Sequence, residues 1–297
     1  MNQIKKIFYS FLSEEFRERT ERIIIGIAIV SFLLHLLVIF LVNQDIIHIS
    51  SKLTKSPISA VYTPFSFILV YEVFLLVFYL PKSISIYIGK QYEIITLIVI
   101  RRIFKDIGNI EMSTNWFKLE NDLQFTYDVL TTLILFYLIH LFYKQIEKQG
   151  NDGIIKTAQH DIRIASFIKL KKRIAMVLIP VLVVLAVYSF ANWLITSIQD
   201  HWNHINTFKN INNIFFEDFF MLLIIIDVIL LLFSFFYSDR FQKIIRNSGF
   251  IISTILIKLS FSVEGIVNNG LILGAVLFGL LILYMHNLYK NKAVLDH

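Results

Sequence analysis

The sequence predicts an all-α integral membrane protein with eight transmembrane helices, arranged as two parallel four-helix repeats. Three observations lead to this fold class. Hydrophobic residues make up 56% of the 297 residues, above the roughly 45–50% of a soluble domain. The apolar residues fall into runs long enough to cross a bilayer, which takes about 20 residues. Finally, two of the runs recur in the second half of the chain with charged residues in corresponding places.

The apolar runs define the expected helices, and the basic residues between them set the orientation. The expected spans are residues 23–43, 62–81, 86–106, 125–143, 174–197, 217–237, 249–267 and 270–288. The third span is the most charged, but removing it would place the most basic connection, 144–173, outside the cell, against the positive-inside rule. With all eight helices spanning, most of the 28 Lys and Arg residues lie inside. We therefore expect a bacterial cytoplasmic (inner) membrane protein with both termini cytoplasmic.

Two further segments have the pattern of amphipathic helices. Residues 1–22 and 154–172 carry apolar side chains at helical spacing with charged side chains between them, a pattern typical of helices at a membrane surface. For residues 1–22, the alternative is an ordinary cytoplasmic helix packed under the bundle. The charge of this first segment does not fit the start of a cleavable signal.

The internal repeat divides the chain into residues 1–150 and 151–297. Glu72-Val73 in the second expected span corresponds to Asp227-Val228 in the sixth, each followed by a similar apolar pattern. Polar anchors at the ends of other spans recur in the same serial order, which favours duplication over chance. Four helices in each half give both halves the same orientation in the membrane.

Charged residues inside the expected spans are the main candidates for function. Glu72 and Arg101 lie on neighbouring antiparallel spans, and so do Asp227 and Lys258. A lone charge at the bilayer centre costs about 2.5–3.5 kcal/mol, so we expect each acid to pair with its base. The pairs fit two interpretations, an ion or proton path and a structural clamp between helices. Since Arg101 stays charged whereas a buried lysine can lose its proton, we expect Asp227 and Lys258 to be the titratable pair.

Other charged side chains have closer candidate partners. Arg102 and Asp106 are spaced i,i+4, and Lys90 and Glu93 are spaced i,i+3, so each couple can neutralise itself on one helix. Glu264 has no partner that the sequence identifies.

Histidines do not indicate a cofactor. His35 lies within the first expected span, and His140 and His286 lie at the ends of the fourth and eighth. Haem ligation needs two ligands at matched depth, and His35 has no counterpart in the second half. We therefore expect neither a cofactor nor a metal site. The chain has no cysteine and none of the common hydrolase, phosphate-loop or metalloprotease motifs, so we do not expect an enzyme.

These features favour a channel or transporter for a small ion or protons. The alternative is a non-transporting membrane scaffold or assembly subunit that docks a partner at the cytoplasmic face. The expected partners are the lipid bilayer and small ions, with a homo-oligomer or a protein at the cytoplasmic face also compatible with the sequence. Nucleic acid is not expected, because the basic residues lie between spans and not in one patch.

Overall fold

The computed structural model describes residues 13–46, 57–107, 120–150, 165–181 with 184, 185 and 188, 208–237, 241–263 and 265–295. All regular secondary structure in these residues is helical, which confirms the all-α class for this part of the chain. The labelled helices are α2 (Glu14–Asn43), the short 3-10 helix η2 (Pro57–Val61), α3 (Tyr62–Tyr79), α4 (Ile84–Ile107), α5 (Glu120–Gly150), α7 (Phe208–Tyr237), α8 (Phe241–Ser260) and α9 (Gly265–Leu295). Residues 165–181 form a further helix.

Six of the expected spans lie within or closely match α2, α3, α4, α5, α7 and α9, whereas the expected span 249–267 covers only the second part of α8 and runs past its end at Ser260. The expected span 174–197 is described only over its first part, where it is helical. Residues 1–12 of the expected first amphipathic helix and residues 154–164 of the second lie outside the described residues.

Local sequence accounts for where several helices begin. Ser13 caps α2, since its hydroxyl accepts a hydrogen bond from the backbone N–H of Phe16 at 3.2 Å. Ser83 does the same at the start of α4 for the N–H of Ile86, at 3.3 Å. Gly265 opens α9 with φ of 70°, a left-handed conformation that glycine adopts without strain. The helices are therefore separated by caps and turns that the sequence encodes.

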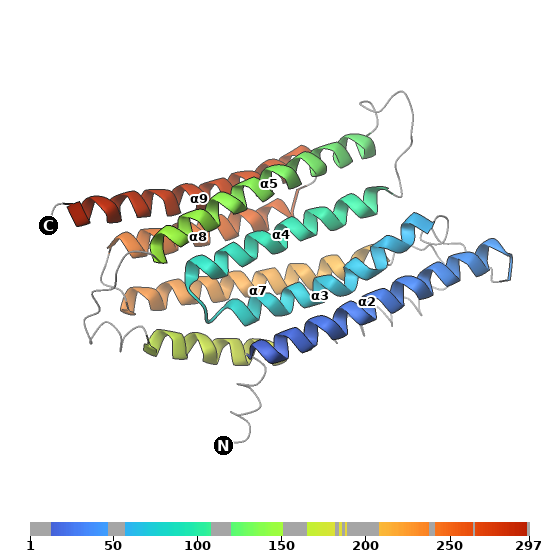
Figure 1. The fold of residues 1–297 in the computed structure, drawn as a ribbon, viewed down its shortest axis with the longest axis horizontal. Coiled ribbons are helices and arrows are strands. Elements are labelled where there is room, and N and C mark those ends of the chain that lie inside the picture. Colours follow the sequence, from blue (N-terminus) through green and yellow to red (C-terminus); the bar gives the residue numbers. More distant parts are fainter. Residues whose placement is uncertain are drawn as a thin grey trace, which may run out of the picture.

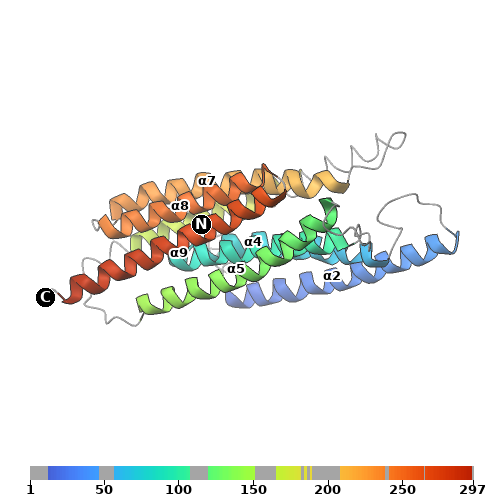
Figure 2. The same ribbon diagram turned by 90° about the horizontal axis from the view of Figure 1, so that it is seen from above.

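The helices run side by side along the long axis of the molecule (Figure 1). Seen from above, α2, α4 and α5 of the first half lie on one side, and α7 and α8 of the second half lie on the other (Figure 2). Sequential helices are neighbours in each half, and the halves meet where α5 packs on α9 and α4 packs on α8. Helix α4 therefore lies at the centre of the assembly.

The core at this junction is aromatic and closely packed. The rings of Tyr92 and Phe250 both contact Phe142 edge-on, with centroids 5.1 and 5.8 Å away. The Tyr92 hydroxyl is hydrogen-bonded to Ser253 of α8 at 2.7 Å. A Cβ atom on Gly279 of α9 would lie 1.8 Å from that hydroxyl, so α9 can approach α4 this closely only with glycine at this position.

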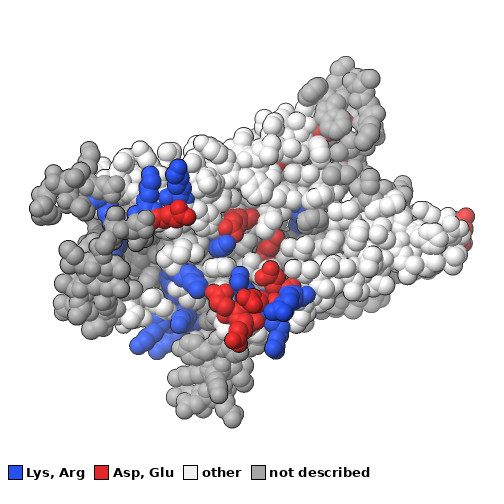
Figure 3. All heavy atoms as spheres, viewed as in Figure 1, with Lys and Arg blue, Asp and Glu red and all other residues white. Residues whose placement is uncertain are grey.

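Three described helices are long and apolar enough to cross a membrane: Glu14–Asn43, Asp122–Lys148 and Gly265–Lys290. Met221–Phe236 is a shorter apolar helix. Many large apolar side chains on these helices face outward. On α2, for example, Val30, Leu33 and Phe40 are 57–58% exposed. In Figure 3 the charged side chains gather on the left and centre of the visible face. The right-hand part, toward the end of α2, is almost uncharged.

Candidate functional site

A buried polar cluster joins α4 to α7 near the end of the bundle where α3 turns into α4. Asp227 of α7 is 3% exposed and Gln91 of α4 is 5% exposed. The Gln91 Nε2 atom donates a hydrogen bond to Asp227 Oδ2 at 3.1 Å. The contact of this carboxylate among the described residues is thus with a neutral amide from the other half of the chain.

Tyr87 completes this cluster. It lies one helical turn before Gln91 and therefore on the same face of α4. The side chain is 2% exposed and lies beside both Gln91 and Asp227. Within the described residues, however, its hydroxyl makes no contact that meets hydrogen-bond geometry. The hydroxyl nevertheless lies close enough to the Asp227 carboxylate and the Gln91 amide to interact with both.

Lys171 is the cation whose charge acts on Asp227. It is 2% exposed, and its Nζ donates to the backbone carbonyl of Lys82, in the turn between α3 and α4, at 3.0 Å. Burial lowers the pKa of Lys171 to about 8, the Asp227 carboxylate raises it in part, and Arg246 of α8 lowers it further. Near neutral pH the ammonium form therefore persists, but with a substantial desolvation cost.

The expected pairing of Asp227 with Lys258 is not the contact found among the described residues, where Gln91 and Lys171 take that place. Depth explains the difference. Asp227 lies ten residues before the end of α7 and Lys258 seventeen residues after the start of α8, so along the two helices they differ in depth by about 10 Å. Asp227 and Lys258 lie on the same pair of sequential helices, but at different depths along them.

The other expected pair is Glu72 with Arg101. Glu72 is 4% exposed, and Arg101 is the cation whose charge acts on its carboxylate. The two residues come from the neighbouring helices α3 and α4. Direct pairing of their side chains stays a prediction.

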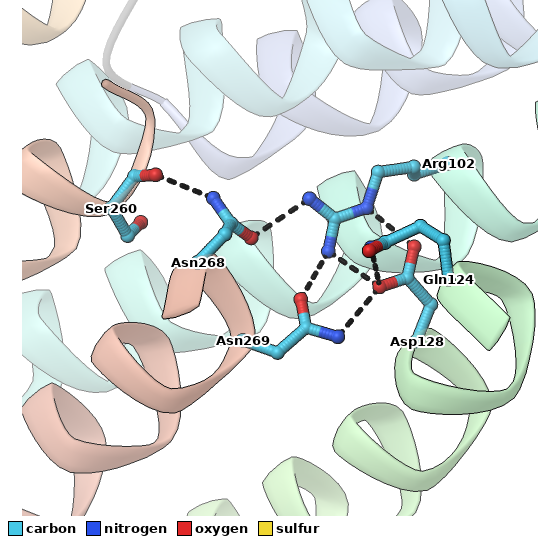
Figure 4. Close-up of polar contacts among 6 residues, drawn as sticks. All are labelled: Arg102, Gln124, Asp128, Ser260, Asn268 and Asn269. Carbon is cyan, nitrogen blue, oxygen red and sulfur yellow. Dashed lines mark hydrogen bonds and ion pairs between the residues drawn. The ribbon is translucent and has the colours of Figure 1, made fainter. Parts of the chain in front are cut away.

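A second polar network, which the sequence did not predict, lies toward the other end of α4 (Figure 4). Arg102 forms an ion pair with Asp128 of α5 and donates hydrogen bonds to it from two guanidinium nitrogens. One of these nitrogens, Nη2, lies 2.6 Å from Oδ1. The same guanidinium donates to the side-chain oxygens of Asn268, at 2.8 Å, and Asn269. Arg102 thereby ties α4 and α5 of the first half to α9 of the second.

Asp128 is as fully satisfied as Arg102. It is 0% exposed and also accepts hydrogen bonds from Gln124, at 2.8 Å, and Asn269, at 2.7 Å. Such charge-assisted bonds are the strong ones in a protein interior. The sequence indicated Asp106 as a partner of Arg102, and the structure shows an ion pair of Arg102 with Asp128.

The remaining sequence candidates are held by local contacts. The predicted Lys90–Glu93 pair forms, at 2.7 Å, and Tyr143 of α5 adds a hydrogen bond to Glu93 at 2.6 Å. His35 of α2 is hydrogen-bonded to Thr63 of α3 at 2.5 Å.

The last candidates lie away from both networks. His286 lies 3.2 Å from the carbonyl oxygen of Gln242, and His140 is exposed. Glu264 lies outside the described residues. Among the described residues, no three His, Cys, Asp or Glu side chains are grouped as a metal site. Comparison with protein-family models, curated proteins and solved structures finds no match for this chain.

Proposed function

We propose that the protein is an integral membrane protein that moves a small ion or protons across the bilayer, with Asp227 as the carboxylate that carries the ion or proton. The membrane setting is supported by the outward-facing apolar side chains. Side chains such as Val30 and Leu33 of α2, each more than half exposed, would face water at a cost of about 25 cal/mol per Å² of apolar area. Lipid removes that cost.

The proposed architecture remains eight spanning helices in two parallel repeats, with both termini in the cytoplasm of a bacterial inner membrane. The order of neighbours supports it, because α3, α4 and α5 follow one another as α7, α8 and α9 do. Equivalent helices also pack together, α4 on α8 and α5 on α9. In this orientation Asp227 lies toward the cytoplasmic side and the Arg102 network toward the outer side.

The proposal rests on the burial and the hydrogen-bond partner of Asp227. Ionisable groups inside a membrane protein are expensive, and those retained there commonly serve transport. Asp227 is buried and hydrogen-bonded by Gln91, a neutral group. Asp128, by contrast, is held by an arginine and two amides. A transporting carboxylate must change occupancy, and of these two only Asp227 has surroundings that permit it.

The test is ion flux through the purified full chain in proteoliposomes. Wild-type protein should dissipate an imposed gradient of protons, Na⁺ or K⁺, and Asp227→Asn should abolish that flux. Asp45→Asn is the matched control, since it makes the same chemical change at an exposed position after α2 and should leave flux unchanged. Absence of flux for every ion tested would refute transport and favour the scaffold. Equal flux from wild type and Asp227→Asn would exclude Asp227 from the path.

A further inference from the structure

A group of basic side chains lies where the start of α8 meets the end of α9, on the left of Figure 1. His286 of α9 holds the two helices together at this level, because its Nδ1 atom lies 3.2 Å from the carbonyl oxygen of Gln242. Lys243 and Arg246 of α8 and Lys290 of α9 lie close enough for their charges to act on the His286 ring. Two helices thus bring three cationic side chains, the α8–α9 basic cluster, to one place.

Arg246 is a partly buried cation whose hydrogen-bond partner among the described residues is neutral. Its Nε and Nη2 atoms donate to the side-chain oxygen of the adjacent Asn247, at 3.3 and 3.1 Å. Burial lowers the pKa of Arg246 to about 10, whereas a neighbouring carboxylate would raise it. An anion bound beside Arg246 would offset this desolvation.

The other charged groups described at this end do not neutralise the cluster. The charge of Arg246 acts on Lys171, but Asp227 balances that lysine. Helix α4, which packs on α8, contributes Lys90 and Glu93, and these two residues pair with each other. Two lysines and one glutamate lie at the end of α5, which packs on α9: Lys144, Lys148 and Glu147. This end of the described chain therefore has excess positive charge, which attracts anions.

Exposed apolar side chains lie within two residues of these basic groups on both helices. Phe241 and Ile245 of α8 are 73% and 45% exposed, and Met285 and Tyr289 of α9 are 47% and 57% exposed. Each couple is spaced i,i+4 and so lies on one face of its helix. A ligand with an anionic head and an apolar tail fits both the cations and these side chains, whereas a soluble anion fits only the cations.

We propose that the α8–α9 basic cluster binds the phosphate headgroup of an anionic phospholipid in the inner leaflet. This inference rests on the proposed membrane orientation, which places the start of α8 and the end of α9 on the cytoplasmic side, and is independent of ion transport. The planar guanidinium of Arg246 can donate two hydrogen bonds to one phosphate, and Lys243 and Lys290 add point charges. Basic groups between helices at this side of a membrane are typical sites for anionic headgroups.

The experiment measures lipid binding to the purified full chain in a neutral detergent. The protein is melted with increasing phosphatidylglycerol, with phosphatidylcholine of the same acyl chains, or with inorganic phosphate, all at constant ionic strength so that screening does not change. A ligand that binds only the folded protein raises the melting temperature as its concentration passes the dissociation constant. Phosphatidylglycerol should stabilise the protein, and the other two compounds should have little effect at the same concentrations.

Arg246→Gln should raise the dissociation constant for phosphatidylglycerol about fivefold, which corresponds to roughly 1 kcal/mol for one basic residue at an anionic surface. Glutamine retains an amide that can donate to Asn247, so melting without lipid shows whether the variant folds. Arg22→Gln is the matched control. It makes the same chemical change on α2, where the Arg22 side chain is 80% exposed, and should leave the dissociation constant unchanged.

A second variant changes the cluster without touching the partly buried arginine. Lys243→Gln combined with Lys290→Gln should raise the dissociation constant more than tenfold, since two charges are lost. Arg246→Lys keeps the charge and should lose less affinity than Arg246→Gln. Equal stabilisation by the two lipids would overturn the inference, and so would wild-type affinity in both Arg246→Gln and the double lysine variant.

The remaining outcomes separate this site from its alternatives. Inorganic phosphate that stabilises the protein as strongly as phosphatidylglycerol would overturn the lipid assignment in favour of a soluble phosphate compound. Phosphatidylglycerol binding without any ion flux would retain the lipid site and reject transport. Ion flux that depends on Asp227, in a protein that does not distinguish the two lipids, would retain the proposed function and reject the lipid site.

Discussion

The two polar regions on α4 differ in how completely their carboxylates are satisfied. Asp128 is held by Arg102, Gln124 and Asn269, whereas Asp227 has Gln91 as its hydrogen-bond donor and Lys171 as a cation acting on it. Gln91 and Arg102 are eleven residues apart on one helix, about 16 Å. Helix α4 thus contacts a carboxylate of α5 through an arginine near one end and a carboxylate of α7 through a neutral amide near the other.

This difference shows that burial of a charge does not by itself indicate function. Both carboxylates are almost inaccessible, yet the partners of Asp128 leave it no spare capacity. Where an arginine and several amides saturate a carboxylate, the group holds helices together. Where the donor is one neutral amide, a proton or cation can compete. Substitutions in either polar region can test this difference.

The largest loss of stability is expected from substitutions in the Arg102–Asp128 ion pair. Arg102→Gln strands Asp128 as a buried charge and should destabilise the protein by about 3–5 kcal/mol. Thermal melting in detergent measures the loss. The double change Arg102→Gln with Asp128→Asn should lose less than Arg102→Gln alone, because no charge is then stranded. Strictly additive losses would contradict the ion pair.

Lys171 provides the next test, through pH. Burial lowers its pKa to about 8 from the ordinary lysine value of 10.5, so between these values the unfolded chain binds more protons than the folded one. Stability should therefore rise with pH across this window, by at most roughly 3 kcal/mol. The measurement is the melting temperature from pH 7.5 to 10.5, taken as the difference between wild type and Lys171→Met, which should lack this rise. Parallel pH profiles would contradict a buried lysine.

A smaller loss of stability is expected where α9 packs against α4, between the two polar regions. Gly279→Ala places a Cβ atom 1.8 Å from the Tyr92 hydroxyl, and overpacking of this kind costs about 1–3 kcal/mol. Gly270→Ala on the same helix has no atom within 4 Å and should be neutral or stabilising, because alanine favours helix. Tyr92→Phe should relieve part of the Gly279→Ala loss. Equal melting of the two alanine variants would show that α4 and α9 are not in close contact.

Sequence reasoning predicted the helices well because long apolar runs and turns carry strong signals. It predicted the Lys90–Glu93 pair, which is local, and missed the partners of Arg102 and Asp227, which come from distant helices. Contacts within one helix follow from residue spacing, whereas contacts between distant helices depend on how the helices pack.

The Arg102 network had a weaker signal in the sequence. Asn268 and Asn269 are consecutive amides at the start of an apolar helix, and Gln124 and Asp128 share one face of α5 by their i,i+4 spacing. Those positions mark polar contacts inside the bundle, but nothing in one sequence states that α9 packs on α5 across the two halves. That packing depends on close approaches such as Gly279 on Tyr92, which become visible only once the helices are assembled.

The smallest change in stability is expected from Asp227→Asn. The asparagine Oδ1 atom can accept the same hydrogen bond from Gln91 that Asp227 accepts at 3.1 Å. The substitution removes a buried charge, which favours folding, and removes its attraction for Lys171, which opposes it. These effects offset one another, so melting in sodium-free buffer should change by less than about 1 kcal/mol. Asp128→Asn makes the same chemical change in the Arg102 network. It should lower the stability by about 2–3 kcal/mol, because it weakens charge-assisted hydrogen bonds from Arg102. Losses of equal size would mean that Asp227 is as tightly paired as Asp128, and the carboxylate would then be unsuited to exchange an ion.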